Sequence, residues 1–335
     1  MATIKEVADL AGVAVGTVSH VITGSVPVSE PLRLKVQAAI RKLDYHPNHV
    51  ARSLKTSKTR TLGIIVPDMT IPFFPKLIRG AEAAARKRGY SIIAVNSDDD
   101  GDRQHDLLSL LRSQRVEGIL LAMAAAPTPV TQIARMVDAG VHIVCLDRIP
   151  DRVSVDCVAL EDIEAAELGV NHLIEQGHRR IAIVTGPQTL KNERQRLLGY
   201  KQAMDRAGLP VDEDLVWFGN LRPEDVTRMC RAHLANGSRP DALFCTNGPT
   251  GLGALRALRD CGLRTPEDIA FVTVDELTVD DLFYPSITTV VQPAFEIGGR
   301  AAEILLDRID SAEIDNSVTV RLKAILKVGE SSRRS

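Results

Sequence analysis

From Thr61 onward the chain alternates short apolar runs with amphipathic stretches. Glycines close several of the amphipathic stretches, as in RKRGY, VDAGV, IEQGH and DRAGL, which is typical of helix C-termini. Strands and helices that alternate in this way predict parallel sheets with helical crossovers. The predicted strands are Leu62 to Val66, Ser91 to Val95, Gly118 to Ala122, His142 to Leu146, Ile181 to Thr185, Ala242 to Cys245 and Ile269 to Val274.

About 270 residues of this pattern are too many for one small core. The tract from Asp151 to Asp156 interrupts the pattern, as expected where the chain crosses from one lobe to the other. We therefore expect two α/β lobes that enclose a cleft between them. Each lobe should present the carboxyl ends of its strands to that cleft, where open α/β sheets bind small molecules.

The first sixty residues have a different, all-helical pattern. Thr3, with Glu6 three places later, can close a capping box at the start of a first helix. Gly12 permits a tight turn before a second short helix, and a third helix begins near Ser29. This arrangement predicts a helix-turn-helix, whose second helix fits the major groove of DNA. It is equally compatible with a three-helix docking module that does not bind DNA.

The charge of the chain is unevenly distributed. Residues 1–60 hold nine Lys and Arg against four Asp and Glu, a net charge of +5, whereas the rest of the chain is net −7. A basic end suggests a polyanion as partner, although solvated charge on a helix face would give the same count.

Two segments carry a resemblance to a known family. IKEVADLAGVAVGTVSHVITG and VSEPLRLKVQAAIRKLDYHPNHVARSLKTSKTRTLGIIVPD resemble the LacI/GalR family of bacterial transcriptional regulators almost without a gap. The resemblance implies a helix-turn-helix domain over residues 1–47 that reads base edges with Val15, Gly16, Thr17 and His20. It further implies that Thr3, Ser19 and Tyr45 touch the DNA backbone.

Residues 48–60 then resemble the hinge helix and linker of the family. About two turns of helix would not persist alone in water, so a partner must stabilise this segment. The resemblance implies that it orders when two subunits bind DNA, with Ala51 and Leu54 in the minor groove and Leu54 wedged between base steps. Without the resemblance, Leu54 would be expected to pack the linker against the core.

Residues 61–335 resemble the periplasmic sugar-binding fold, which implies a two-lobe ligand-sensing and dimerisation domain. We expect lobe one to span about 61–158 and 290–317, and lobe two about 159–289 and 318–335. The implied effector-binding residues are Phe73, Phe74, Asp147, Arg148, Asn192, Arg196, Asn247 and Asp275, with Gln292 as a weaker candidate.

The chain departs from the family pattern at several of these positions. Gly248 stands where an aspartate is usual, Leu160-Glu161 replaces Asp-Asn, and Leu221 takes a position that is often aromatic. Binding a purine would require more polar contacts than these leucines provide, so we expect the effector to be a sugar, a polyol or a related polar metabolite. Inducer and co-repressor roles remain equally open.

The sequence lacks the signature motifs of several other functional classes. GxGxxG after a strand, GxxxxGK[ST], HExxH and GxSxG do not occur, so we expect no catalytic residue, no cofactor and no metal. The carboxylate runs Asp98-Asp99-Asp100 and Asp280-Asp281 are expected to be solvated surface. The five cysteines form no CxxC pair and are expected to be reduced core or surface thiols.

The sequence also bears on location and assembly. No apolar run approaches the roughly 20 residues of a membrane span and the N-terminus is charged, so we expect a cytoplasmic protein without a membrane partner. The short tail GESSRRS has no leucine heptads, which favours a homodimer over a tetramer.

The function predicted from the sequence is that of a transcriptional regulator, and more specifically a repressor. It would bind a palindromic operator as a dimer under the control of a sugar-like effector. The alternative is a cytoplasmic small-molecule-binding protein of the same fold that binds no operator.

Overall fold

The computed structural model describes residues 2–23, 26–45, 59–125, 130–151, 153–235, 239–277, 284–311 and 316–333. The chain divides into two compact units, Met1–Thr59 and Arg60–Ser335. The predicted hinge helix, with Ala51 and Leu54, lies outside the described residues.

The N-terminal unit contains α1 (Ile4–Ala11), α2 (Val15–Thr23) and α3 (Glu30–Lys42). The predicted capping box is confirmed, because the Thr3 side chain accepts a hydrogen bond from the Glu6 backbone N–H while the Glu6 carboxylate accepts one from the Thr3 N–H. Gly12 is left-handed, with φ of 66°, as the predicted tight turn requires. A small core holds the three helices together through Val7, Ala8, Ala11, Val18, Val36 and Ala39.

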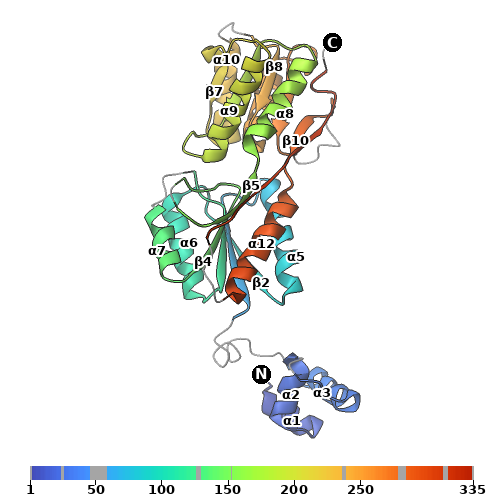
Figure 1. Ribbon diagram of the computed structural model, residues 1–335. Coiled ribbons are helices and arrows are strands. Elements are labelled where there is room, and N and C mark those ends of the chain that lie inside the picture. Colours follow the sequence, from blue (N-terminus) through green and yellow to red (C-terminus); the bar gives the residue numbers. More distant parts are fainter. Residues whose placement is uncertain are drawn as a thin grey trace. The chain divides into compact units, whose positions relative to one another are not determined.

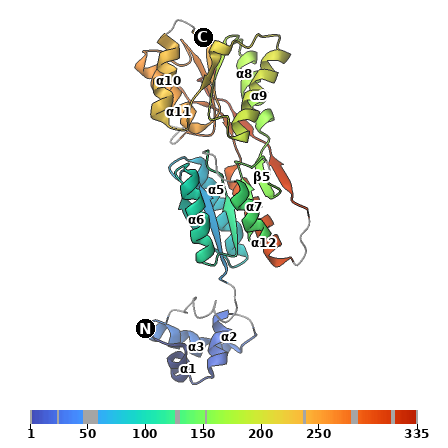
Figure 2. The same ribbon diagram turned by 90° about the vertical axis from the view of Figure 1, so that its left-hand side faces the viewer.

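The larger unit contains two six-stranded sheets, each of which forms the centre of one lobe (Figures 1 and 2). The first sheet has the order β11-β5-β4-β3-β1-β2 and the second has the order β12-β10-β9-β8-β6-β7. The strands of the first lobe are β1 (Thr61–Val66), β2 (Ser91–Asn96), β3 (Gly118–Leu121), β4 (His142–Leu146), β5 (Asp156–Leu160) and β11 (Thr319–Leu322). Those of the second lobe are β6 (Ile181–Thr185), β7 (Val216–Phe218), β8 (Ala242–Cys245), β9 (Ala270–Val274), β10 (Thr288–Val291) and β12 (Ile325–Lys327).

All pairings in the two sheets are parallel except that of β12 with β10, which is antiparallel. The predicted parallel sheets are therefore confirmed. Each predicted strand is present to within about two residues, whereas β5, β7 and β10 to β12 were not anticipated.

Helices cover both faces of each sheet (Figures 1 and 2). In the first lobe, α5 (Phe73–Lys87) and α12 (Ala294–Asp310) pack on one face, and α6 (Gly101–Ser113) and α7 (Val130–Asp138) on the other. In the second lobe, α8 (Asp162–Glu175) and α9 (Lys191–Arg206) oppose α10 (Pro223–Ala235) and α11 (Gly248–Asp260). A short 3₁₀ turn, η1 (Glu213–Leu215), precedes β7.

The predicted lobe boundaries need correction near the C-terminal end. Residues 288–291 form β10 in the second sheet, so the chain returns to the first lobe with α12 rather than at 290. Strand β11 pairs with β5, so the first lobe keeps the chain through Leu322 rather than through 317. The strands TVRL and ILK are too short for their pattern to show which sheet each one joins.

Helices α5 and α12 approach each other through glycines. A Cβ atom on Gly298 would lie 1.9 Å from the Leu77 carbonyl oxygen, and one on Gly80 would lie 1.9 Å from the Phe295 carbonyl oxygen. Both obstacles are backbone atoms, which no side-chain rotation can clear. The close packing of this helix pair therefore depends on the two glycines.

The cysteines are as expected from the sequence. All five thiols are free; Cys145, Cys157, Cys230 and Cys245 are buried and Cys261 is exposed. None of the described helices combines the length and apolar character that crossing a membrane would require.

Candidate functional site

All eight predicted effector residues line a single pocket between the two lobes. Asp147, Asn247, Asp275 and Gln292 lie just beyond the carboxyl ends of β4, β8, β9 and β10. Phe73 and Phe74 begin α5, and Asn192 and Arg196 lie in the first turns of α9. Ile71, Glu193, Leu221 and Pro249 complete the lining of a pocket with about 350 Å³ of empty space. The strand ends therefore assemble a site where the sequence predicts one.

Arg196 is a deeply buried charged group of the pocket, with 2% of the residue exposed. Its Nε donates to Asp162 Oδ1 at 2.9 Å and its Nη1 donates to the Thr246 carbonyl oxygen at 2.7 Å. Its Nη2 is buried and has no hydrogen-bond partner within the described part of the chain. A buried guanidinium N–H without an acceptor is costly, so this donor is available to a ligand oxygen.

Two carboxylates hold Arg196 in place, and sequence reasoning missed both. Asp162 is the first residue of α8, and Glu193 Oε1 lies 3.6 Å from Arg196 Nη1. Burial raises the pKa of Asp162 to about 7, although the adjacent guanidinium opposes the shift. An acidic residue in the first turn of a helix is usually solvated and helps the helix dipole, so nothing in the sequence separates these two from ordinary surface acids.

Glu193 also organises the neighbouring strand ends. Its carboxylate accepts hydrogen bonds from the Gly186 N–H at 2.8 Å, from the Thr246 hydroxyl at 2.5 Å and from Asn247 Nδ2 at 2.9 Å. Asn247 Oδ1 in turn accepts from the Thr250 N–H and caps α11. Both ends of the Asn247 amide are thus engaged by the protein, so its position at the pocket reflects a capping role rather than a free polar contact.

Asp275 and Gln292 form a second polar pair in the pocket. Gln292 Nε2 donates to Asp275 Oδ1 at 2.8 Å, and Gln292 Oε1 is buried without a partner among the described residues. Burial raises the pKa of Asp275 to about 6, against the opposing charge of Arg196. Asp275 has φ of 72° and Asp147 has φ of 59°, so both lining carboxylates are in the left-handed region that non-glycine residues rarely adopt.

Arg148 connects the pocket to the first lobe. It forms an ion pair with Asp99, donates to the Met123 carbonyl oxygen at 3.2 Å and lies 5.9 Å from the centroid of the Phe74 ring. Asp99 also accepts from the Ala125 N–H. The expectation of solvated surface was therefore wrong for Asp99, which the fold turns toward Arg148. Asp98 and Asp100 are exposed as expected, and Asp280 and Asp281 lie outside the described residues.

Phe73 and Phe74 are both buried, and their rings meet edge to face with centroids 5.2 Å apart. They belong to the core of the first lobe as well as to the pocket lining. The structure therefore places them both in the core and in an apolar wall of the pocket.

Polar contacts join the two lobes around the pocket. Lys76 forms an ion pair with Glu276, Arg194 Nη2 lies 2.5 Å from Asp151 Oδ2, and the Thr189 hydroxyl donates to the Ala125 carbonyl oxygen at 3.0 Å. Each contact pairs one lobe with the other, so a movement that separates the lobes must break them.

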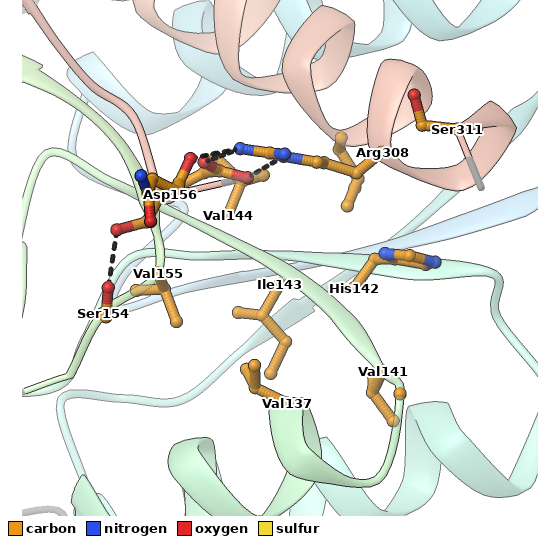
Figure 3. A pocket seen from close by; sticks show the side chains of 14 residues that line it. Val137, Val141, His142, Ile143, Val144, Ser154, Val155, Asp156, Arg308 and Ser311 are labelled. Atoms are coloured by element: carbon orange, nitrogen blue, oxygen red, sulfur yellow. Dashed lines mark hydrogen bonds and ion pairs between the residues drawn. The ribbon is translucent and has the colours of Figure 1, made fainter. Parts of the chain in front are cut away.

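A second hollow, with about 1000 Å³ of empty space, lies at the amino ends of β4 and β5 (Figure 3). Arg308 reaches across it and donates to both oxygens of Asp156 at 2.8 and 2.9 Å, and the Ser154 and Ser317 hydroxyls are 2.7 Å apart. These polar groups are paired with one another across the seam between α12 and β5.

In the N-terminal unit, α2 presents much of the predicted base-reading set. Val15, Gly16 and His20 are exposed, while Thr17 and Ser19 are half-buried. A Cβ atom at Gly16 would meet nothing within 4 Å, so this part of the helix surface is open. Thr3 is exposed but its hydroxyl caps α1, and Tyr45 packs partly against the small core. Within the described residues no cluster of three or more His, Cys, Asp or Glu side chains could hold a metal ion.

Comparisons with known proteins bear on both units. Residues 3–48 match the family described as bacterial regulatory proteins of the lacI family, and residues 59–325 match the periplasmic binding proteins and sugar binding domain of the LacI family. The chain is 37% identical to the ribose operon repressor of Escherichia coli K12 over 309 residues, which cover 92% of this chain and 93% of the relative. It is 36% identical to the HTH-type transcriptional repressor PurR of Vibrio atlanticus over 320 residues, which cover 95% of each chain.

Among solved structures, the transcriptional regulator CelR in complex with cellobiose superimposes with a TM-score of 0.74 and 34% identity. The alignment covers 99% of this chain and 100% of CelR. The sequence and structural similarities thus extend over the N-terminal unit and the larger unit alike.

Proposed function

The chain belongs to the LacI family of bacterial regulatory proteins, and from this premise we propose that it is a transcriptional repressor that binds operator DNA as a homodimer under the control of a small-molecule effector. The observation that carries the effector part is the pair of unsatisfied buried groups in one pocket, the donor Arg196 Nη2 and the acceptor Gln292 Oε1. A ligand with hydroxyl groups satisfies both, since a hydroxyl can accept from the first and donate to the second.

The charge of the pocket favours a neutral polyhydroxyl compound. Asp147, Asp162, Glu193 and Asp275 surround the Arg196 guanidinium, and Arg148 pairs with Asp99 and Asp147. An anionic effector such as a phosphorylated sugar would face this excess of carboxylates in a poorly solvated site. A relative named for the ribose operon and a structural neighbour solved with cellobiose support a sugar.

The proposed mechanism is a two-state switch. The effector favours one arrangement of the lobes over the other, because it contacts Arg196 and Asp275 from the second lobe and Phe74 and Arg148 from the first. Polar contacts such as Arg194 to Asp151 then form or break with the lobe movement. Effector and operator must influence each other's affinity reciprocally, typically by about 1 to 3 kcal/mol. The relatives are named as repressors, and we propose no catalytic activity.

Selection of bound sequences from random duplexes tests the DNA-binding part. Two identical DNA-binding domains in a dimer favour an operator with two-fold symmetry. We expect the full chain at moderate salt to enrich a palindrome. Enrichment of an asymmetric single half-site, or of no sequence in the presence and absence of candidate sugars, would contradict the proposal.

His20→Ala is expected to weaken binding to the selected palindrome by roughly 5- to 150-fold per half-site, as a lost base contact costs about 1 to 3 kcal/mol. His20 is exposed on α2 and its ring can donate or accept at a base edge. Fluorescence anisotropy with the palindrome and with an unrelated duplex measures the effect.

The matched control is His105→Ala, since His105 is an exposed histidine of the larger unit. It should leave both affinities unchanged. An equal loss of affinity for the two duplexes in His20→Ala would show that His20 contributes no base discrimination.

Effector affinity is expected to depend on pH through Asp275, whose pKa is about 6 because of burial. The ionised carboxylate accepts ligand hydroxyls, so the contribution of Asp275 to affinity should be constant above about pH 7 and fall up to about tenfold per pH unit below 6. Calorimetric titration between pH 7.5 and 5 measures this.

Asp275→Asn is the control, because an amide oxygen can still accept the Gln292 hydrogen bond without titrating. Its affinity should be lower than that of the unmodified chain and much flatter with pH. An unmodified chain whose affinity is independent of pH would exclude Asp275 as the acceptor.

A further inference from the structure

The chain enters the larger unit at Arg60, and the backbone of this residue is held on both sides. The Arg60 N–H donates to Glu117 Oε1 at 2.5 Å, and the Arg60 carbonyl oxygen accepts from the Ser91 N–H at 2.9 Å. Arg60 directly precedes β1, Glu117 directly precedes β3 and Ser91 begins β2. These three strands are neighbours in the first sheet, so their amino ends together fix the point at which the chain enters.

The conformation of Arg60 shows that this point depends on its surroundings. Its φ is 50°, in the left-handed region that non-glycine residues rarely adopt and that neighbouring contacts must maintain. The side chain is held as well, because Nη1 donates to the Arg88 carbonyl oxygen at 3.2 Å and Cζ lies 5.8 Å from the centroid of the Tyr90 ring. The backbone and the side chain of Arg60 are therefore both fixed by the first lobe.

Tyr90 holds the carboxylate that binds Arg60. Its hydroxyl donates to Glu117 Oε2 at 2.8 Å, while its ring is buried in the core of the first lobe. Burial and this hydrogen bond raise the pKa of Tyr90 to about 12, so the hydroxyl remains a donor at neutral pH. Each oxygen of Glu117 thus accepts a hydrogen bond, one from the Arg60 backbone and one from Tyr90. We refer to Arg60, Tyr90 and Glu117 as the entry cluster.

Helix α12 braces the entry cluster. Arg88, whose carbonyl oxygen accepts from Arg60, donates from Nη1 to Asp307 Oδ1 and from Nη2 to Asp310 Oδ2, each at 2.6 Å. Both aspartates lie in the last turn of α12. A cluster that is supported by strands and helices holds its position more precisely than one built on loops.

A fixed entry point has a consequence for DNA binding by a homodimer. The two Arg60 residues mark where the two DNA-binding domains are joined to the larger units. If these points are fixed, the domains fit one separation of half-sites better than others; if they are loose, the domains adapt to several separations and lose more entropy on binding. One added base pair shifts a half-site by about 3.4 Å and turns it by about 35° about the DNA axis.

We propose that Glu117 is a positioning residue that sets how strictly the dimer discriminates between operators of different half-site spacing. It acts through the Arg60 N–H and the Tyr90 hydroxyl rather than by contact with a base. This inference rests on the proposed function and specifies how the operator is selected.

The test compares two duplexes, the palindrome selected by the full chain and the same palindrome with one base pair inserted at its centre. Fluorescence anisotropy gives the Kd for each duplex, and the spacing ratio is the second Kd divided by the first. We expect the unmodified chain to prefer the selected spacing. Glu117→Ala should reduce the spacing ratio by roughly 2- to 30-fold, the range over which residues without ligand contact modulate coupling between sites.

Tyr90→Phe is a second variant, which keeps the test valid if Glu117→Ala does not fold. It retains the buried ring, removes the hydroxyl that holds Glu117 and should also reduce the spacing ratio. Glu117→Gln should keep the ratio within about twofold of the unmodified chain, because the amide can accept from the Arg60 N–H and donate to the Tyr90 hydroxyl oxygen. The control is Glu82→Ala, at an exposed position of α5 that pairs with Arg86, which should leave the ratio unchanged.

An equal loss of affinity for both duplexes in Glu117→Ala and Tyr90→Phe would show a general structural role and overturn the inference. An unchanged spacing ratio in both variants, or equal binding of the two spacings by the unmodified chain, would overturn it as well. In each of these cases the selection of a palindrome leaves the proposed function intact. If the unmodified chain selects no palindrome, the proposed function itself fails and the inference fails with it.

Discussion

Arg196→Ala is expected to reduce effector affinity at least 100-fold. The substitution removes the unpaired Nη2 donor from the pocket and leaves Asp162 and Glu193 as buried carboxylates without their cation. Removing one partner of a buried ion pair costs about 3 to 5 kcal/mol, so the second lobe should also lose stability. Calorimetric titration with the effector measures the affinity, and chemical denaturation measures the free energy of unfolding.

Two variants separate these effects. Arg196→Lys keeps a positive charge near the carboxylates but lacks the planar guanidinium group. Compared with Arg196→Ala, it should therefore restore the stability more than the effector affinity. Arg206→Ala, at an exposed position of the same helix where the side chain pairs with Glu167, should change either quantity little. Near-normal effector affinity in Arg196→Ala would remove the main support for this pocket as the effector site.

Gly298→Ala is expected to destabilise the first lobe by at least about 3 kcal/mol, at the upper end of the usual cost of overpacking. The new methyl group would lie 1.9 Å from the Leu77 carbonyl oxygen, so α5 and α12 must move apart along their whole contact. Those two helices cover one face of the first sheet, and α5 carries Phe73 and Phe74. Thermal and denaturant unfolding measure the loss.

Gly299→Ala is a closely matched control, one residue further along the same helix. Its Cβ would meet the Gly80 carbonyl oxygen at 3.6 Å, an ordinary contact. Because alanine favours helix over glycine by up to about 1 kcal/mol, this variant should be neutral or slightly more stable. Equal stability of the two variants would show that α5 and α12 do not pack as closely as described.

Much of the fold could be predicted from the sequence because its signals are local. The capping box at Thr3, the left-handed Gly12 and the apolar strands each depend on residues within a few positions of one another. The short strands β5 and β11 pair over a separation of some 160 residues, and neither has enough length to reveal its partner. Long-range pairing of this kind therefore could not be predicted from the sequence. The predicted lobe boundaries were wrong for the same reason.

In the site, too, local features could be predicted from the sequence and long-range contacts could not. The family resemblance indicated Asp147, Asn247 and Asp275, and all three line the pocket, because the carboxyl ends of parallel strands share one edge of a sheet. Their roles depend on contacts between distant segments. Glu193, an unremarkable helix acid in the sequence, engages the Asn247 amide, and Asp99 pairs with Arg148 across 49 residues.

The measurement that tests the central claim most directly is thermodynamic linkage on the full chain. Operator affinity is measured with and without saturating effector, and effector affinity is measured with and without saturating operator. The two ratios should agree and lie between about 5 and 150. An effector that binds the pocket and leaves operator affinity unchanged would contradict the account of this protein as an effector-controlled repressor.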